Sequence, residues 1–221
     1  MKRVNYTPPR SPAVPEELPG PPPGWGVDHD ERLSGALVSG EDWSGLSARG
    51  LTLGEVRLAG VRLAGADLEA LHMRDAMVSG CDAANLRARG ASLVRVVVDG
   101  SRLMGADLAE AELHDVVLRE CRLDLAGLRF ARLTRVLFED CEMAGADFGS
   151  ATLESVGFVS CGLDGVDLSG ATLSGCELRG CVVDGVRGVE RLRGSAMPWP
   201  DLVRNAGAFA AALGVGVADD E

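Results

Sequence analysis

The chain has 221 residues, a formal net charge of −11 and 46% hydrophobic residues, which is enough for one domain with a sizeable core. No apolar run approaches the roughly 18 residues needed to cross a bilayer, and prolines stand where a secretory signal would have its apolar stretch. The composition argues against a membrane protein, and we expect a cytoplasmic location.

Residues 1–24 are expected to form a proline-rich arm, because they hold eight of the ten prolines of the chain. Such a composition is typical of an extended or disordered segment. We interpret the arm as a tail or strap that lies on the rest of the protein. The alternative is a ligand for an aromatic groove in another protein.

Residues 25–50 follow an irregular pattern and are expected to form an N-terminal cap. A repeating fold exposes its core and a strand edge at each end, so a cap is physically expected there. The apolar residues that could cover the first coil are Leu33, Leu37, Trp43 and Leu46.

Residues 51–187 repeat every five residues without a break in register. The third position of each block is large and apolar almost throughout, as at Leu53 and Leu168, and the first is small or β-branched, as at Ala66 and Val96. The fifth position is most often glycine, which accepts the positive φ that a type II turn requires. Each block is therefore expected to form one short side and one corner.

A longer period predicts how many sides make one coil. Cysteines recur every 20 residues at the first position, from Cys121 to Cys181, and series of valines and alanines have the same spacing. Twenty residues are four blocks, so in a four-sided coil each residue stacks on a residue of the same type one coil later. The sequence predicts an all-β fold, a parallel β-solenoid of about six to seven coils that each rise roughly 4.8 Å.

The blocks 66–70 (ADLEA), 106–110 (ADLAE) and 146–150 (ADFGS) carry the loose motif A-(D/N)-L-x-x. In this motif residues 51–187 resemble the pentapeptide-repeat family. The resemblance implies a right-handed quadrilateral parallel β-helix, whose handedness the period alone does not give. Because one fold supports many functions, the resemblance is more specific for fold than for function.

The residues that usually carry chemistry lack a site in this sequence. All cysteines occupy the inward first position without a CxxC pair, so we expect core packing, although distance alone does not exclude a disulfide between stacked cysteines. Glu112, His114 and Asp115 are close in sequence, but no nucleophile or cleft accompanies them. We expect a protein without catalytic activity, metal or cofactor. The cysteines are Cys81, Cys121, Cys141, Cys161, Cys176 and Cys181.

Charge is distributed unevenly along the repeat. Residues 51–135 hold twelve acids and twelve arginines, whereas residues 136–190 hold ten acids and two arginines. A dimer that joined two such acidic segments would match duplex DNA, with about one charge per 1.7 Å, in order of magnitude. The acids predicted to form this surface are Glu139, Asp140, Glu142, Asp147, Glu154, Asp164, Asp167, Glu177 and Asp184.

Residues 188–221 are expected to hold a C-terminal helix and an acidic tail. Apolar residues spaced three or four apart predict an amphipathic helix over 202–213, with Gly214 as its stop. This helix could cap the last coil or pair with a second copy. The region resembles the C-terminal dimer module of quinolone-resistance pentapeptide-repeat proteins, which implies a homodimer. The residues assigned to the cap or dimer contact are Trp199, Leu202, Ala206, Phe209 and Leu213.

The same resemblance implies a role as a DNA mimic that binds DNA gyrase or topoisomerase IV and counteracts topoisomerase poisons, which is a form of antibiotic resistance. In that role the protein itself would bind no nucleic acid. The alternative is a scaffold for protein–protein interactions. Leu125 and Phe130 favour the scaffold, because both place an apolar side chain at a corner that should be polar.

Overall fold

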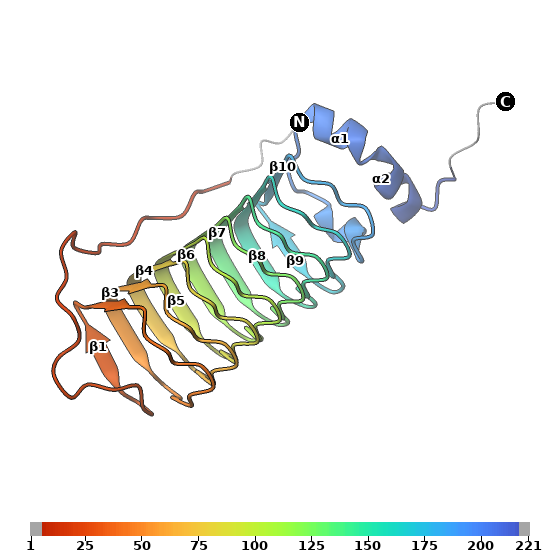
Figure 1. Ribbon diagram of the computed structural model, residues 1–221. Coiled ribbons are helices and arrows are strands. Elements are labelled where there is room, and N and C mark those ends of the chain that lie inside the picture. Colours follow the sequence, from red (N-terminus) through yellow and green to blue (C-terminus); the bar gives the residue numbers. More distant parts are fainter. Residues whose placement is uncertain (1–5, 217–221) are drawn as a thin grey trace.

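The blocks of five form the sides of a four-sided coil in the computed structural model, which describes residues 6–216 (Figure 1). Two adjacent sides carry strands, and each strand pairs in parallel with the strand 20 residues later, as Val96 does with Val116 and Val116 with Val136. The other two sides are joined by single bridges at the same spacing, such as Asp67 to Arg87. The predicted quadrilateral parallel β-helix is confirmed.

The strands form one sheet in the order β1-β3-β4-β5-β6-β7-β8-β10, with β2 also on β3 and β9 also on β8. Their bounds are β1 Arg32–Ser34, β2 Leu37–Ser39, β3 Thr52–Ala59, β4 His72–Ser79, β5 Ser92–Asp99, β6 Glu112–Arg119, β7 Arg132–Glu139, β8 Thr152–Val159, β9 Thr172–Ser174 and β10 Glu177–Arg179.

The corners adopt the predicted left-handed backbone. Gly65 has φ 67°, and residues that replace glycine at the fifth position take the same conformation, as Asn85 does with φ 54°. This φ costs a side-chain-bearing residue free energy, which explains why glycine prevails at the corners. The coil therefore turns inside each block without losing its inward positions.

The first and third positions of the blocks fill the core. All six cysteines are buried free thiols, and the Sγ of Cys161 lies 3.4 Å from the carbonyl oxygen of Phe138. Burial raises the pKa of the Cys81 thiol, so that side chain stays protonated and packs as a small apolar group. In the C-terminal coils, Phe138 stacks on Phe158 with ring centroids 5.2 Å apart.

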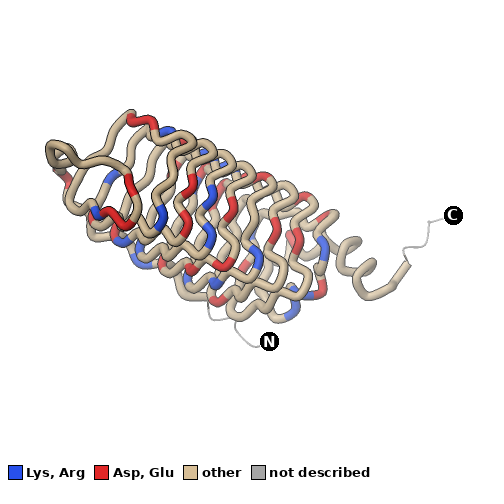
Figure 2. The backbone as a smooth tube through the Cα atoms, turned by 90° about the horizontal axis from the view of Figure 1, so that it is seen from below, with Lys and Arg blue, Asp and Glu red and all other residues tan. Residues whose placement is uncertain are grey.

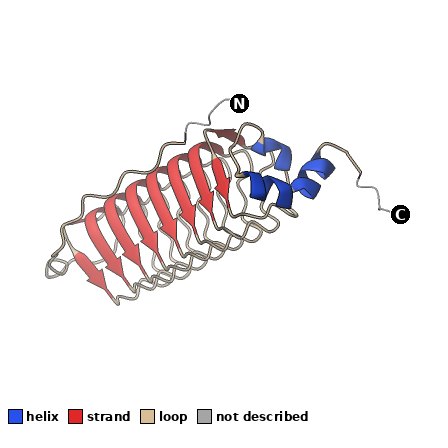
Figure 3. Ribbon diagram, turned by 90° about the horizontal axis from the view of Figure 1, so that it is seen from above, coloured by secondary structure: helices blue, strands red, loops and turns tan. Residues whose placement is uncertain are grey.

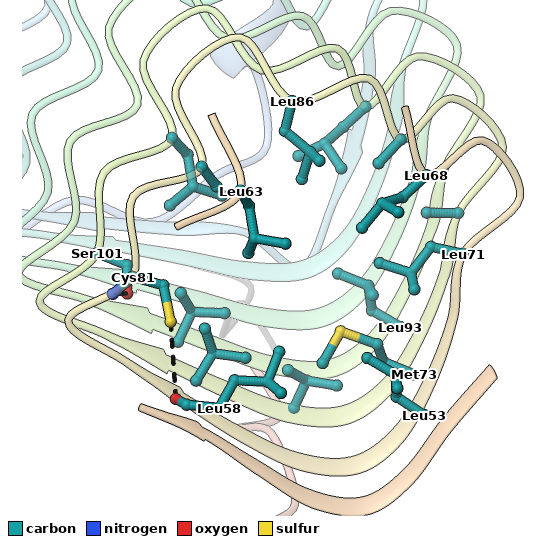
Figure 4. A pocket seen from close by; sticks show the side chains of 18 of the residues that line it. Leu53, Leu58, Leu63, Leu68, Leu71, Met73, Cys81, Leu86, Leu93 and Ser101 are labelled. Atoms are coloured by element: carbon teal, nitrogen blue, oxygen red, sulfur yellow. Dashed lines mark hydrogen bonds between the residues drawn. The ribbon is translucent and has the colours of Figure 1, made fainter. Parts of the chain in front are cut away.

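One part of the core is incompletely filled. An apolar cavity of about 80 Å³ lies within the N-terminal coils, between side chains such as Leu63, Leu68 and Met73 (Figure 4). Ala83 and Ala88 line it, and they are the two residues in 51–187 at which the third position shrinks from a large side chain to a methyl group. The cavity results from this local loss of volume.

The solenoid begins one coil earlier than the sequence analysis predicted. Residues 31–50, expected to be an irregular cap, form a regular coil in which Leu33 pairs with Leu53. Of its four first positions, Ala36 is buried, whereas Glu31, Glu41 and Leu46 are exposed. The open end is covered instead by the tilted rings of Trp25 and Trp43, whose centroids are 6.0 Å apart.

The proline-rich arm lies lengthwise along the solenoid, as the strap interpretation predicted (Figures 1 and 3). It runs from the C-terminal coils back to the first coil, where Leu37 N–H donates to the Pro19 carbonyl oxygen at 2.7 Å. The half-buried residues Tyr6, Pro9 and Pro12 are three apart, which is the repeat of a polyproline II helix. We call residues 6–18 the strap.

The C-terminal region forms three short helices: η1 Val189–Leu192, α1 Trp199–Arg204 and α2 Ala206–Ala212. The helix predicted over 202–213 is present, but it is divided into α1 and α2, because the chain breaks at Asn205, whose side chain turns into the last coil. Within residues 6–216, no helix is long and apolar enough to span a membrane. The acidic tail at 217–221, like residues 1–5 of the arm, lies outside the described residues.

Candidate binding surfaces

The nine acids of the predicted acidic surface all escape burial in the core, but the structure does not gather them on one face. Asp147 and Asp167 stack on one side of the coil, and Glu142 stacks with Gly162 on another. Glu139 belongs to β7 on a strand-bearing side. Figure 2 shows acidic and basic residues interspersed along the tube. The acids therefore encircle the rod.

Arginine neutralises five of the nine acids. Arg119 Nε lies 2.7 Å from a carboxylate oxygen of Glu139 one coil later, and Arg122 Nε lies 3.0 Å from one of Glu142. Exposed pairs of this kind contribute about 0–1 kcal/mol each to stability. They nevertheless reduce the charge that a partner would meet. The paired acids are Glu139, Glu142, Asp147, Asp167 and Glu177.

Four acids remain exposed and form no ion pair with any residue in 6–216. They are Asp140, Glu154, Asp164 and Asp184. We call this set the unpaired acids. Because no arginine forms an ion pair with them, their charge remains available to a basic partner.

The N-terminal coils are neutral because their acids and arginines are equal in number, and most of these arginines pair with an acid. Arg62 lies 2.8 Å from Asp42, and Arg87 lies 2.9 Å from Asp67. The spacing is again 20 residues, so the pairs run along the axis of the rod. The paired arginines therefore link neighbouring coils along the rod.

Asp201 and Asn205 hold the C-terminal helices on the last coil. Val183 N–H donates to Asn205 Oδ1 at 2.8 Å, and Asn205 Nδ2 donates to the Cys181 carbonyl oxygen at 3.0 Å. Gly180 N–H donates to Asp201 Oδ2 at 2.8 Å. These side chains satisfy backbone groups at the end of the solenoid, where the next coil is missing. The apolar spacing that predicts the helix gives no sign of these two polar side chains.

The apolar residues assigned to the cap or dimer contact divide into two groups. Phe209 packs partly against the core, whereas Trp199 and Leu213 are 75% and 80% exposed, and Leu202 and Ala206 are exposed too. Beside them a groove of about 660 Å³ opens between the helices and the end of the solenoid. The helices thus cap the last coil and leave an apolar surface facing outward.

Leu125 and Phe130 form the predicted apolar corners. Their side chains are 69% and 53% exposed, and their φ angles are 59° and 60°. The guanidinium of Arg129 lies 5.4 Å from the centre of the Phe130 ring. An exposed apolar side chain in a left-handed backbone gains nothing from burial and costs free energy in strain. Both residues therefore stand where the fold alone would favour glycine or asparagine.

The strap binds two carboxylates at fifth positions of the repeat, those of Asp75 and Asp115. Arg10 N–H donates to Asp115 Oδ1 at 3.0 Å, and Ala13 N–H donates to Asp75 Oδ1 at 3.1 Å. Asp75 is 7% exposed and Asp115 is 2% exposed. Their burial could not be predicted, because it results from the path of the strap.

Arginines one coil further on hold both carboxylates. Arg135 Nε and Nη2 donate to the two oxygens of Asp115 at 2.6 and 2.8 Å, and Arg95 binds both oxygens of Asp75. The Arg135 hydrogen bonds lower the pKa of Asp115 to about 2, and Arg95 lowers the pKa of Asp75. Both carboxylates are therefore ionised acceptors at neutral pH.

The strap ends in a recess at Gly157. A Cβ atom on Gly157 would lie 3.0 Å from the Tyr6 hydroxyl and 3.1 Å from Cζ of its ring, so the missing side chain makes room for the ring. The Tyr6 hydroxyl is buried and has no hydrogen-bond partner within residues 6–216. Desolvation, followed by the charges of Glu177 and Glu139, raises the pKa of Tyr6.

Taken together, the coils define a protein with a parallel β-solenoid fold and five-residue sides. A protein-family model described as "Pentapeptide repeats" matches eight copies in residues 79–124 and 161–186. The solenoid is therefore built of pentapeptide repeats, as the motif predicted. A search of curated proteins by sequence finds no match.

Several solved structures are similar to the chain. HetL, a pentapeptide-repeat protein involved in heterocyst differentiation regulation from the cyanobacterium Nostoc sp. strain PCC 7120, is 21% identical, with a TM-score of 0.34, and covers 77% of this chain and 91% of its own. Full-length QnrB1, a plasmid-mediated fluoroquinolone resistance protein, is 17% identical, with a TM-score of 0.31 and coverages of 84% and 100%. A pentapeptide-repeat protein of the Arabidopsis thaliana thylakoid lumen is 21% identical, with a TM-score of 0.25 and coverages of 50% and 63%.

Proposed function

We propose that this protein is a binding protein without catalytic activity, and that its acidic C-terminal coils mimic duplex DNA at the DNA-binding surface of DNA gyrase or topoisomerase IV. The observation that carries the proposal is the set of unpaired acids, Asp140, Glu154, Asp164 and Asp184, on the coils where acids outnumber arginines. A basic protein surface attracts an acidic rod electrostatically, and dissolved salt shortens the range of this attraction. Binding would modulate the enzyme or protect it from topoisomerase poisons.

If the acidic coils mimic DNA, the unpaired acids should contribute more to gyrase binding than the acids that are paired with arginine. Reversing Asp164 and Asp184 to Lys should weaken inhibition of gyrase supercoiling at least tenfold, because both carboxylates lack an arginine that already neutralises them. The measurement is a supercoiling titration at two salt concentrations, with and without a topoisomerase poison.

The matched control reverses Glu112 and Glu120, two exposed acids of the neutral coils. It makes the same change in net charge and should leave inhibition within a factor of two. Equal loss in both variants would point to net charge alone, and no inhibition by the unmodified protein would reject the mimic.

A homodimer joined through the C-terminal helices would place two acidic segments end to end. The exposed side chains of Trp199 and Leu213, next to the apolar groove, support this arrangement. Sedimentation of the unmodified protein and of Leu213→Asp tests it. A mass that is the same in both, and that equals one chain, would remove the dimer from the proposal.

The second candidate function is a scaffold that docks a protein partner at Leu125 and Phe130. Their strained and exposed positions favour it. Replacing both by Ser should abolish capture of that partner and leave any effect on gyrase intact. Retained capture by the double Ser variant would reject this site.

Replacing Leu125 by Gly should raise the free energy of unfolding by about 1 kcal/mol, because Gly accepts the positive φ.

A further inference from the structure

A pocket lies at the N-terminal end of the solenoid, opposite the end that carries α1 and α2 (Figure 1). Its volume is about 430 Å³, which falls in the range of roughly 300–1,000 Å³ that small-molecule sites occupy. Trp25 and Trp43 line it, together with aliphatic side chains such as Val38 and Leu46 and the carboxylate residue Glu41. We call it the tryptophan pocket.

Both rings of the tryptophan pocket are held in place by the fold. Trp25 N–H donates to the Pro22 carbonyl oxygen at 3.0 Å, and Trp25 Nε1 donates to the Arg32 carbonyl oxygen at 3.1 Å. Trp43 is buried in the first coil, and the planes of the two rings are tilted by 54°. The aromatic wall is therefore formed before any ligand arrives, which lowers the entropic cost of binding.

Glu41 places a carboxylate beside the aromatic wall. It occupies a first position of the repeat, where the following coils bury a small residue, as at Val61 and Cys81. Glu31 is also charged at a first position of this coil, but Glu41 is the one of the two that lines the pocket. It forms no ion pair with any residue in 6–216. A charged residue that the repeat does not call for points to a function.

The surroundings of the tryptophan pocket carry a negative charge. Residues 25–50 hold five acids and two arginines. Asp42 also lines the pocket, but Arg62 lies 2.8 Å from one of its oxygens and Ser44 N–H donates to the other at 3.0 Å. Glu41 is therefore the carboxylate in the pocket wall that is left to balance a positive ligand.

This combination of groups suits an alkylated ammonium ion. A cation is attracted to the face of an aromatic ring within about 6 Å of its centre, and tryptophan is the strongest of the aromatic residues in this respect. A primary ammonium has three N–H groups that need acceptors, whereas a fully alkylated one presents only methyl groups. Aromatic and aliphatic walls with one free carboxylate therefore match the alkylated ion better than the primary one.

We propose that the tryptophan pocket is a binding site for a ligand with an alkylated ammonium group of the choline type. The ring faces of Trp25 and Trp43 contact the methyl groups, and Glu41 balances the charge. The site is at the other end of the rod from the acidic C-terminal coils. Its test is therefore independent of the proposed binding to gyrase.

Calorimetric titration of the full-length protein at constant ionic strength tests the proposal. Choline should bind at least tenfold more tightly than 3,3-dimethylbutanol, which has the same shape without the charge. In a Trp199→Phe protein, Trp25 and Trp43 are the remaining tryptophans, so a change in fluorescence that saturates at the same choline concentration places the ligand beside them. Sedimentation with phosphatidylcholine vesicles distinguishes a lipid headgroup from a free solute as the source of the group.

Glu41→Gln should weaken the binding of choline about tenfold and leave that of the neutral alcohol unchanged, because it removes only the charge. The matched control is Glu31→Gln, an exposed acid at a first position of the same coil that does not line the pocket. It should change choline affinity by less than a factor of two. Trp25→Phe keeps an apolar ring over the core and should also weaken choline binding. Circular dichroism with thermal melting shows that each variant is folded.

Three results would overturn the proposal. The first is no saturation with millimolar choline, which would leave the two rings as a cover for the core. The second is equal affinity for choline and the neutral alcohol, which would make the pocket apolar rather than cation-selective. The third is an equal loss in the Glu41→Gln and Glu31→Gln proteins, which would assign the binding to net charge.

Discussion

At the scale of single residues, the fifth position of the block has two structural roles. Glycine there turns the corner, as the sequence analysis predicted, but Asp75 and Asp115 adopt the same positive φ and direct carboxylates toward the strap. The sequence identified these positions as outward corners. It could not show that a segment about 60 to 105 residues away would cover them, because that contact depends on the folded path of the arm.

The recess at Gly157 gives a prediction about Tyr6. Gly157→Ala should move the pKa of Tyr6 back toward its ordinary value of 10.0, because the added methyl group occupies the space of the ring. The raised pKa means that the docked strap favours the neutral phenol. The contribution of Tyr6 to docking is therefore fully present below pH 10 and is lost as the pH rises through the raised pKa.

Ultraviolet titration of the full-length protein checks this prediction. Gly162→Ala is the matched control, since a Cβ atom on Gly162 would meet no atom within 4 Å. The control should titrate like the unmodified protein. A Gly157→Ala protein with an unshifted Tyr6 would show that the strap is not held through the recess.

At the scale of elements, the helices at the C-terminus act through polar contacts as much as apolar ones. The spacing of apolar residues predicted a helix but missed the break at Asn205. Asparagine lowers helix propensity only modestly, so its effect on the helix was not visible in sequence. The role of Asn205 is to bind the unpaired backbone groups of the last coil, and these groups lie beside it only in the folded structure.

Asn205→Ala should lower the free energy of unfolding by about 2 kcal/mol, because the Val183 N–H and the Cys181 carbonyl lose their buried partner. Urea denaturation measures the loss, and amide hydrogen exchange should show faster exchange at Val183. Val203→Ala, on the exposed face of α1, is the control and should change stability little. Equal stability of the two variants would mean that the helices do not hold the last coil.

The cavity in the N-terminal coils predicts a stabilising substitution. Leu68 and Leu108 occupy the third position one coil before and after Ala88, so a leucine at 88 continues their column into empty space. Ala88→Leu should raise the free energy of unfolding by about 1 kcal/mol. The same change at Ala106, which is fully buried and does not line the cavity, should destabilise by about 1–3 kcal/mol. Denaturation of both variants decides whether the cavity has usable volume.

At the scale of the whole molecule, the five-residue period was sufficient to predict the four-sided coil, its parallel register and its core. The period also continues through Gly35, Gly40, Gly45 and Gly50, so the first coil was visible in the sequence. Glu31 and Glu41 obscured it, because they place charged residues at first positions, which inner coils fill with small or β-branched residues. The predicted acidic residues face outward, but their pairing with arginine depends on which residues stack one coil apart.

The direction of the strap also has a mechanical consequence. Because the strap runs back along the rod, Tyr6 lies at the end of the molecule that carries α1 and α2 (Figure 1). A pulling force applied between the two chain ends would break the contacts of the strap one after another, first at Tyr6, then at Arg10 and then at Ala13. The stacked coils would bear the force only after these contacts are broken. Contacts broken one at a time yield at lower force than contacts sheared together, so the strap would extend while the solenoid remains intact.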